Sequence, residues 1–162
     1  MGGPVASTTQ DVDVEAERVD SNPVSRIGDS YSWVNLNSFS AHGGKLLFYH
    51  GVSDPWFSAK DTIDYYQRMT QTNGGAAKVT GWSRLFLSPG MGHCGGGAAT
   101  LDNFDMLSAA VNWVEKNQPP ESVMATGRAF PGRSRPLCAY PAHAQYNGAG
   151  DPEDGKNYSC KQ

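Results

Sequence analysis

The sequence of 162 residues lacks any long apolar run. None of its apolar stretches approaches the length of about 20 residues that a membrane-spanning helix requires. It also lacks an excess of basic residues, because 13 Lys and Arg stand against 16 Asp and Glu. The first residues, Met-Gly-Gly-Pro, have neither the basic nor the apolar region of a signal peptide. We therefore expect no membrane contact, no nucleic-acid partner and no signal peptide in this chain.

Two kinds of functional motif are also missing. The string G-x-S-x-G, which presents the nucleophile of many serine hydrolases, occurs nowhere, and the nearest strings, GVSDP and GWSRL, both lack the final glycine. No CxxC or HxxxH spacing supports a zinc site, although His50, His93 and Cys94 are conceivable ligands. The sequence therefore predicts no metal and no cofactor in this chain.

The composition divides the chain into two parts. Residues 1–30 are acidic, polar and free of aromatic side chains, so we interpret them as a poorly ordered leader or as the remnant of something larger. Residues 31–162 contain all the aromatic side chains and have the length of one domain or part of one. With 19 glycines and 10 prolines in the whole chain, many loops are expected.

The pattern of apolar residues predicts an α/β fold. Residues 45–50 (KLLFYH) form a compact apolar run typical of a buried strand, and residues 84–87 (RLFL) form a second one. Between them, Ser58 can cap a helix that ends at Asn73-Gly74-Gly75. With the helix that follows, the order is β-α-β-α, which is typical of an open α/β sheet.

The remaining segments are predicted from weaker signals. A helix is expected to begin at Asp102, because four apolar residues follow at the spacing of an amphipathic stripe that faces a core: Phe104, Leu107, Val111 and Val114. A short helix is expected over residues 31–39. Beyond Met124 we see no periodicity and predict only turns.

Two polar residues follow the predicted strands. Asp54 lies in GVSDPWFS after the first strand, and His93 lies in GMGHCGGG after the second. Open α/β sheets form their sites at the carboxyl ends of strands, so Asp54 is positioned to accept the Nδ1 proton of His93 and to fix the tautomer of a general base. This is the chain order of the acid and the base of an α/β-hydrolase Ser-Asp-His triad. The pattern indicates the acid-and-base half of a serine hydrolase.

Plainer interpretations of the same residues remain open. Ser-Asp-Pro is an ordinary turn string, and a histidine among glycines can simply occupy a surface loop. His50, at the end of a strand, is predicted to be structural. The string GMGHCG also matches the dinucleotide fingerprint G-x-G-x-x-G, but that fingerprint requires its last glycine to open a helix, and the next helix is expected only at about Asp102. We therefore do not predict a phosphate-binding loop.

The three cysteines cannot all pair within the chain. A disulfide between Cys138 and Cys160 would hold together a tail rich in glycine, proline and asparagine, and would contribute roughly 3 kcal/mol. Cys94 is then either a small buried thiol or the partner of a cysteine on a segment that this chain lacks. Disulfides would indicate an oxidising compartment.

The segments GGKLLFYHGVSDP and GMGHCGGG, together with the C-terminal cysteine pair, resemble the tannase and feruloyl esterase family. The resemblance extends from about residue 32 to residue 162. It implies an α/β-hydrolase catalytic domain that a large lid domain interrupts, with the nucleophile in a Gly-Cys-Ser-x-Gly-Gly elbow. By this resemblance Asp54 is the triad acid and His93 the base, while Cys94 pairs with the cysteine before the nucleophile and Cys138 pairs with Cys160.

The sequence departs from the family pattern in what it leaves out. The elbow is absent, and so is the lid with its substrate contacts and its structural calcium site. The resemblance therefore implies the C-terminal portion of an α/β-hydrolase fold, without the nucleophile-elbow half and the lid domain.

The resemblance also implies an activity. The expected activity of the parent protein is hydrolysis of carboxylic esters of aromatic acids, such as galloyl or hydroxycinnamoyl esters, by a secreted or periplasmic serine esterase. Its partner would be a small aromatic ester. The chain alone is expected to be inactive, and the alternative is a non-catalytic fragment or interaction module that retains the fold.

Overall fold

The computed structural model describes residues 17–18, 21–28 and 31–162, and the chain divides into two units, residues 1–34 and 35–162. The first unit contains the short helix α2 (Pro23–Gly28), at whose start the side-chain carbonyl of Asn22 accepts a hydrogen bond from the amide of Val24. The prediction of a poorly ordered segment over residues 1–30 concerns mainly residues that lie outside the described ones. No helix among the described residues is long and apolar enough to cross a membrane.

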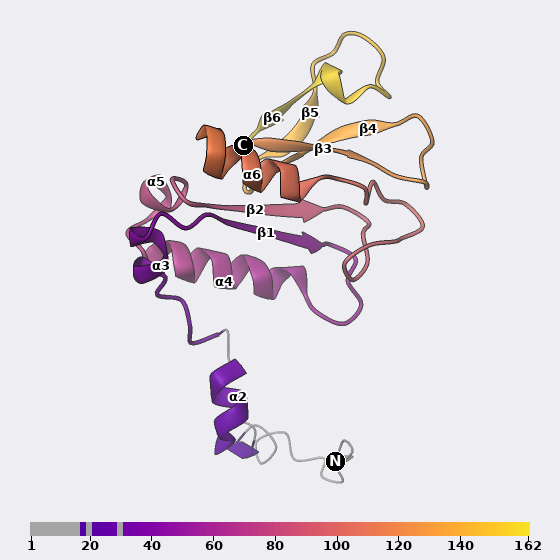
Figure 1. Ribbon diagram of the computed structural model, residues 1–162. Coiled ribbons are helices and arrows are strands. Elements are labelled where there is room, and N and C mark those ends of the chain that lie inside the picture. The colour runs from indigo at the N-terminus through magenta and orange to yellow at the C-terminus, as the bar shows by residue number, and fades with distance from the viewer. Residues whose placement is uncertain (1–16, 19–20, 29–30) are drawn as a thin grey trace. The chain divides into compact units, whose positions relative to one another are not determined.

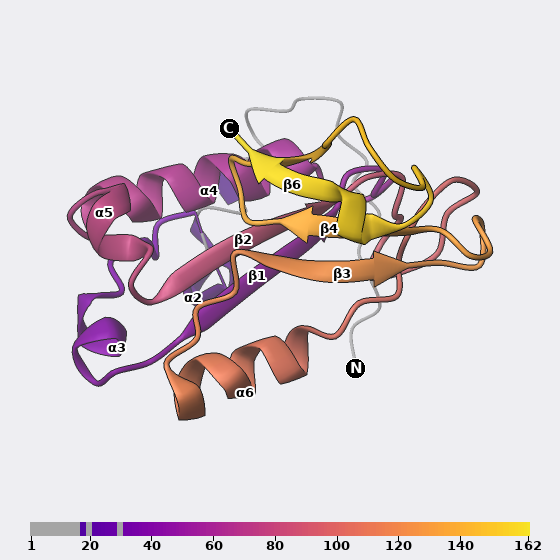
Figure 2. The ribbon, with the colours of Figure 1, turned by 90° about the horizontal axis from the view of Figure 1, so that it is seen from above.

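The second unit is built around two parallel strands, β1 (Leu46–Gly51) and β2 (Ser83–Ser88). Their register pairs Gly51 with Ser88, so both strands end at the same edge. Helix α4 (Ala59–Thr72) lies on one side of the pair, and helix α6 (Met106–Lys116) lies on the other (Figure 1). Seen from above, β1 and β2 run side by side between these helices (Figure 2). The predicted β-α-β-α order is confirmed.

Helix α4 begins and ends where the sequence predicts. Ser58 has an extended backbone, and its hydroxyl accepts a hydrogen bond from the amide of Lys60 at 3.2 Å. At the other end, Asn73 is the C-cap. The short helix expected over residues 31–39 is displaced and forms α3 (Asn37–Ala41), whose N-cap is Leu36. Just before it, the side-chain carbonyl of Asn35 accepts a hydrogen bond from the amide of Asn37. A further short helix, α5 (Ala76–Val79), follows α4 and was not predicted.

Strand β2 lies at the centre of the core. Leu85 and Phe86 are fully buried, as expected for a strand covered on both faces. Phe86 belongs to a cluster that joins the parallel pair to the C-terminal strands, with Ala125, Leu137 and Ala139 buried and with Leu47, Leu101, Phe104, Met106 and Val123 packed against it. Within the described part of the chain, β1 pairs with β2 alone, so its other edge is unpaired.

The predictions for α6 require two corrections. The helix begins at Met106 rather than at Asp102, because Asp105 is the N-cap and its carboxylate accepts hydrogen bonds from the amide and the hydroxyl of Ser108, at 2.8 and 2.6 Å. The buried residue of the helix is Trp113. The guanidinium carbon of Arg84 lies over its ring, 5.1 Å from the ring centroid.

The apolar stripe of α6 does not face the core of this chain. Leu107, Val111 and Val114 are 76%, 41% and 65% exposed. Only Phe104, which precedes the helix, packs against the cluster around Phe86. The spacing correctly predicted a helix, but it did not show that the covering surface lies within this chain.

The C-terminal third contains regular structure that the sequence did not reveal. Two antiparallel pairs form there, and between the strands of the second pair a 3-10 helix precedes the last strand: β3 (Ser122–Thr126), β4 (Ser134–Cys138), β5 (His143–Tyr146), η1 (Gly155–Asn157) and β6 (Tyr158–Lys161). The prediction of turns alone is therefore wrong. These strands have only four or five residues each, too few for an alternating pattern to stand out.

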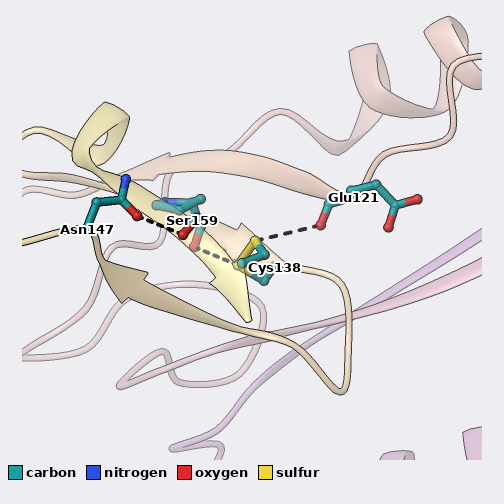
Figure 3. Close-up of a disulfide and its surroundings, with 6 residues drawn as sticks. Glu121, Cys138, Asn147 and Ser159 are labelled. Carbon is teal, nitrogen blue, oxygen red and sulfur yellow. Dashed lines mark hydrogen bonds between the residues drawn. A yellow bond between two sulfur atoms is a disulfide. The ribbon is translucent and has the colours of Figure 1, made fainter. Parts of the chain in front are cut away.

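A disulfide joins the two antiparallel pairs. Cys138 at the end of β4 is bonded to Cys160 in β6, as predicted (Figure 3). Beside it, the hydroxyl of Ser159 donates a hydrogen bond of 2.7 Å to the side-chain carbonyl of Asn147. The bond closes a loop of 22 residues and holds the C-terminal strand against the rest of the unit.

Candidate active site

The loops that follow β1 and β2 are held together by their backbones. The amide of Ser53 donates a hydrogen bond to the carbonyl of Met91 at 2.9 Å. At Gly51, a Cβ atom would lie 2.2 Å from the carbonyl oxygen of Gly92, so no side chain fits there. The two loops are thus fixed against each other at the edge where both strands end.

Asp54 is held by a tight turn of its own loop. Its Oδ1 atom accepts hydrogen bonds from the amides of Trp56 and Phe57, at 2.8 and 3.1 Å. This pattern is an Asx turn, which Asp followed by Pro favours. The side chain is only 3% exposed, so the turn buries the carboxylate and leaves Oδ2 to face the neighbouring loop.

His93 contacts Asp54 where the two loops lie side by side. Its Nδ1 lies 2.7 Å from Oδ2 of Asp54. Because an ionised carboxylate only accepts hydrogen bonds, Nδ1 carries the proton and Nε2 of the neutral ring is an acceptor. The ring is 37% exposed and lies against two aromatic side chains, with its centroid 5.1 Å from that of Trp56 and 5.4 Å from that of Phe57.

The carboxyl group of Asp54 is strongly acidic. Burial by itself raises its pKa, but the hydrogen bonds from His93 and from the amides of Trp56 and Phe57 outweigh that effect, and the pKa falls to about 2. The group is therefore ionised throughout the neutral range and can stabilise a positive charge on His93.

The glycine-rich loop depends on conformations and close contacts that favour glycine. Gly90 has a φ of +72°, and a Cβ atom there would lie 2.0 Å from the carbonyl oxygen of Ala99. The amide of Gly96 donates a hydrogen bond of 2.7 Å to the carboxylate of Asp102. The sequence predicts Asp102 at the start of a helix, whereas in the structure its carboxylate binds the loop that carries His93. The sequence signal that could have indicated this contact is an acidic residue a few positions after a glycine-rich string.

The other candidate residues are placed less centrally. Cys94 is exposed with a free thiol and a φ of +59°, so the interpretation as a buried thiol is wrong. The last glycine of the GMGHCG string does not open a helix, since α6 begins only at Met106. Among the described residues, no group of three or more His, Cys, Asp and Glu side chains is arranged to hold a metal ion.

Comparison with known proteins gives this geometry a context. Residues 5–161 match the family model described as tannase and feruloyl esterase. Over 132 residues the chain is 47% identical to the mono(2-hydroxyethyl) terephthalate hydrolase of Piscinibacter sakaiensis, an alignment that covers 78% of this chain and 21% of that protein. The chain thus spans about a fifth of the length of this relative.

Two solved structures of esterases also resemble the chain. A crystal structure of an esterase from Aspergillus oryzae matches with a TM-score of 0.68 and 31% identity, covering 79% of this chain and 29% of that one. Feruloyl esterase B from the same organism matches with a TM-score of 0.63 and 29% identity over the same shares. These neighbours are esterases, which is consistent with a partial α/β-hydrolase-like domain. The chain therefore belongs to the tannase and feruloyl esterase family of carboxylic ester hydrolases.

Proposed function

We propose that residues 35–162 supply the acid and the base of a Ser-Asp-His triad that hydrolyses carboxylic esters of aromatic acids. The observation that carries this proposal is the 2.7 Å contact between Nδ1 of His93 and Oδ2 of Asp54 at the carboxyl ends of two parallel strands. Family membership supports it. The nucleophilic serine would come from polypeptide outside these 162 residues, as would the lid domain.

In the proposed reaction, Nε2 of His93 takes the proton of the serine hydroxyl while the serine oxygen bonds to the ester carbonyl carbon. The same nitrogen then gives that proton to the alcohol oxygen as its bond to the carbonyl carbon breaks. In the second half, Nε2 takes a proton from water, the resulting hydroxide displaces the serine oxygen, and the proton returns to serine. Asp54 remains ionised throughout and stabilises the imidazolium.

The surroundings of His93 support aromatic substrates. Trp56 and Phe57 contact the imidazole ring and are still mostly exposed, so an aromatic group next to His93 would find apolar faces to pack against. The names of the relatives, a terephthalate ester hydrolase and a feruloyl esterase, fit this preference. The Cys138–Cys160 disulfide supports a secreted or periplasmic parent protein, and the exposed thiol of Cys94 is free to pair with a cysteine beside the serine.

A second candidate function is a non-catalytic interaction module. The exposed stripe of Leu107, Val111 and Val114 on α6 favours association with another polypeptide. A catalytic half would also need such an association, so exposure alone does not separate the two. Ester hydrolysis by a protein that combines this chain with the missing nucleophile distinguishes them.

The test is a chimera in which this chain replaces the aligned segment of the Piscinibacter sakaiensis hydrolase. We expect the folded chimera to hydrolyse mono(2-hydroxyethyl) terephthalate or a feruloyl ester, and Asp54→Asn to lower kcat by about 10⁴-fold. Asp64→Asn is the matched control, because Asp64 pairs with Arg68 on the surface of α4 and should leave kcat unchanged. A folded but inactive chimera, or ester turnover by the isolated chain, would contradict the proposal.

A further inference from the structure

A second histidine, His50, contacts the loop that carries Asp54. His50 is the fifth residue of β1, and its side chain is 14% exposed. Its Nε2 atom lies 3.1 Å from the carbonyl oxygen of Phe57, and its Nδ1 atom lies 2.8 Å from the hydroxyl of Thr62 in α4. The imidazole therefore joins the end of a strand, the acid loop and the helix that follows.

These contacts define which nitrogen of His50 carries the proton. A carbonyl oxygen can only accept, so Nε2 must donate to Phe57. In the neutral ring, Nδ1 is then an acceptor and the hydroxyl of Thr62 donates to it. His50 and His93 thus have opposite tautomers, with the proton of His50 on Nε2 and that of His93 on Nδ1.

The same Nε2–H group also faces the acid. Nε2 of His50 lies 3.6 Å from Oδ2 of Asp54, the oxygen that accepts the proton of His93. That distance is too long for a hydrogen bond, but it places the positive end of the N–H dipole beside the carboxylate. Oδ2 is therefore flanked by two imidazoles, whereas Oδ1 is bonded to backbone amides alone.

We propose that His50 is a positioning residue for the Asp54–His93 pair, an inference that rests on the proposed function of that pair. By holding the carbonyl of Phe57, His50 closes the turn whose amides bind Oδ1 of Asp54. Thr62 fixes the tautomer that this task requires. Without His50, the turn would lose the hydrogen bond that joins the carbonyl of Phe57 to a side chain of β1, and Oδ2 would no longer be aimed at Nδ1 of His93.

The test measures the tautomer of His93 in the ¹⁵N-labelled chain by long-range ¹H–¹⁵N correlation of the imidazole, in mildly alkaline buffer. In the unmodified chain we expect the Nδ1–H form of His93. We expect His50→Leu to lose most of that form, and His50→Gln to retain it, because the Gln amide can donate to Phe57. His42→Leu is the matched control, since His42 is the exposed C-cap of α3 and its Nδ1 lies 2.7 Å from the carbonyl oxygen of Ser38, outside the Asp54 loop.

Thr62 provides a second pair of variants should His50→Leu fail to fold. Thr62→Val leaves Nδ1 of His50 without its donor and should weaken the hold of His50 on Phe57, with a partial loss of the Nδ1–H form at His93. Thr62→Ser restores the donor and should restore the tautomer of His93. A merely structural role for His50 would change stability but not the tautomer of His93 in chains that give a folded amide spectrum.

The outcomes distinguish a failure of the proposed function from a failure of the positioning role of His50. If His93 of the unmodified chain is mainly in the Nε2–H form, the Asp54–His93 pair is not formed and the proposed function fails. If His93 has the Nδ1–H form and keeps it in folded His50→Leu or Thr62→Val, the pair stands and the positioning role of His50 is overturned. Loss in these variants with rescue by Gln and Ser supports the role.

Discussion

Gly51→Ala is the smallest change that should disturb the candidate site. The added Cβ atom would lie 2.2 Å from the carbonyl oxygen of Gly92 and 2.4 Å from that of Met91. Both obstacles are backbone atoms, so no flexible side chain can give way. The loop that carries His93 must move by more than about 1 Å before the Cβ–oxygen distance reaches an ordinary value of about 3.4 Å.

The expected cost follows from these contacts. Overpacking of this kind costs about 1–3 kcal/mol, and displacement of Met91 also removes the hydrogen bond from the amide of Ser53, which contributes about 1 kcal/mol. We therefore expect Gly51→Ala to lower the free energy of unfolding by about 2–4 kcal/mol in urea titrations. The Nδ1–H tautomer of His93 should be lost with it, because His93 is carried by the displaced loop.

Gly92→Ala is the matched control. It adds the same methyl group within the same contact, but its Cβ atom would lie 3.5 Å from the nearest backbone oxygen, an ordinary distance. We expect a change within about 0.5 kcal/mol. Equal stability of the Gly51→Ala and Gly92→Ala chains would refute the close approach of the two loops on which the site depends.

Three further predictions address other parts of the chain. Cys138→Ser should lower the free energy of unfolding by about 3 kcal/mol, the value for a closed loop of about this length, and a smaller change than 1 kcal/mol would show that the tail is held by packing instead. Asp54 has a pKa of 3.8 in the unfolded chain and about 2 in the folded one, so its stabilisation is complete above pH 3.8 and is lost as the pH falls through about 2. Urea titrations from about pH 5 to about pH 2 should show a larger loss of stability in the unmodified chain than in Asp54→Asn, in which the lowered pKa values of Asp105 and Glu153 still contribute. Leu107→Lys with Val114→Lys should leave stability within about 0.5 kcal/mol and increase solubility in light-scattering assays, since both residues are mostly exposed; strong destabilisation would mean that the stripe is buried.

The central β-α-β order could be predicted from the sequence because each signal was local. Residues 45–50 and 84–87 each contain a short run of apolar side chains, and Ser58 and Asn73 mark the ends of α4. The contact of Asp54 with His93 could be anticipated as well, because parallel strands end at one edge and both residues lie in loops that follow a strand. Their catalytic role stays a prediction.

Other features could not be predicted because they depend on how side chains of different elements meet in the folded chain, which no local sequence pattern records. The link between Thr62, His50 and Phe57 joins three elements and leaves no local pattern. The exposure of Leu107 shows the limit of periodicity, which predicts an amphipathic helix but not where its covering surface lies. The sequence predicts Asp102 at a helix start because no local rule distinguishes a helix cap from an acid whose carboxylate binds a loop amide.

The central claim is that His93 is the general base of an ester hydrolase, and kcat of the His93→Ala chimera tests it most directly. The measurement compares this variant with His42→Ala in the chimera described above, with either ester as substrate. The account predicts that His93→Ala lowers kcat by about 10⁴-fold or more, while His42→Ala leaves it unchanged. A folded His93→Ala chimera that retains the activity of the His42→Ala control would contradict the account.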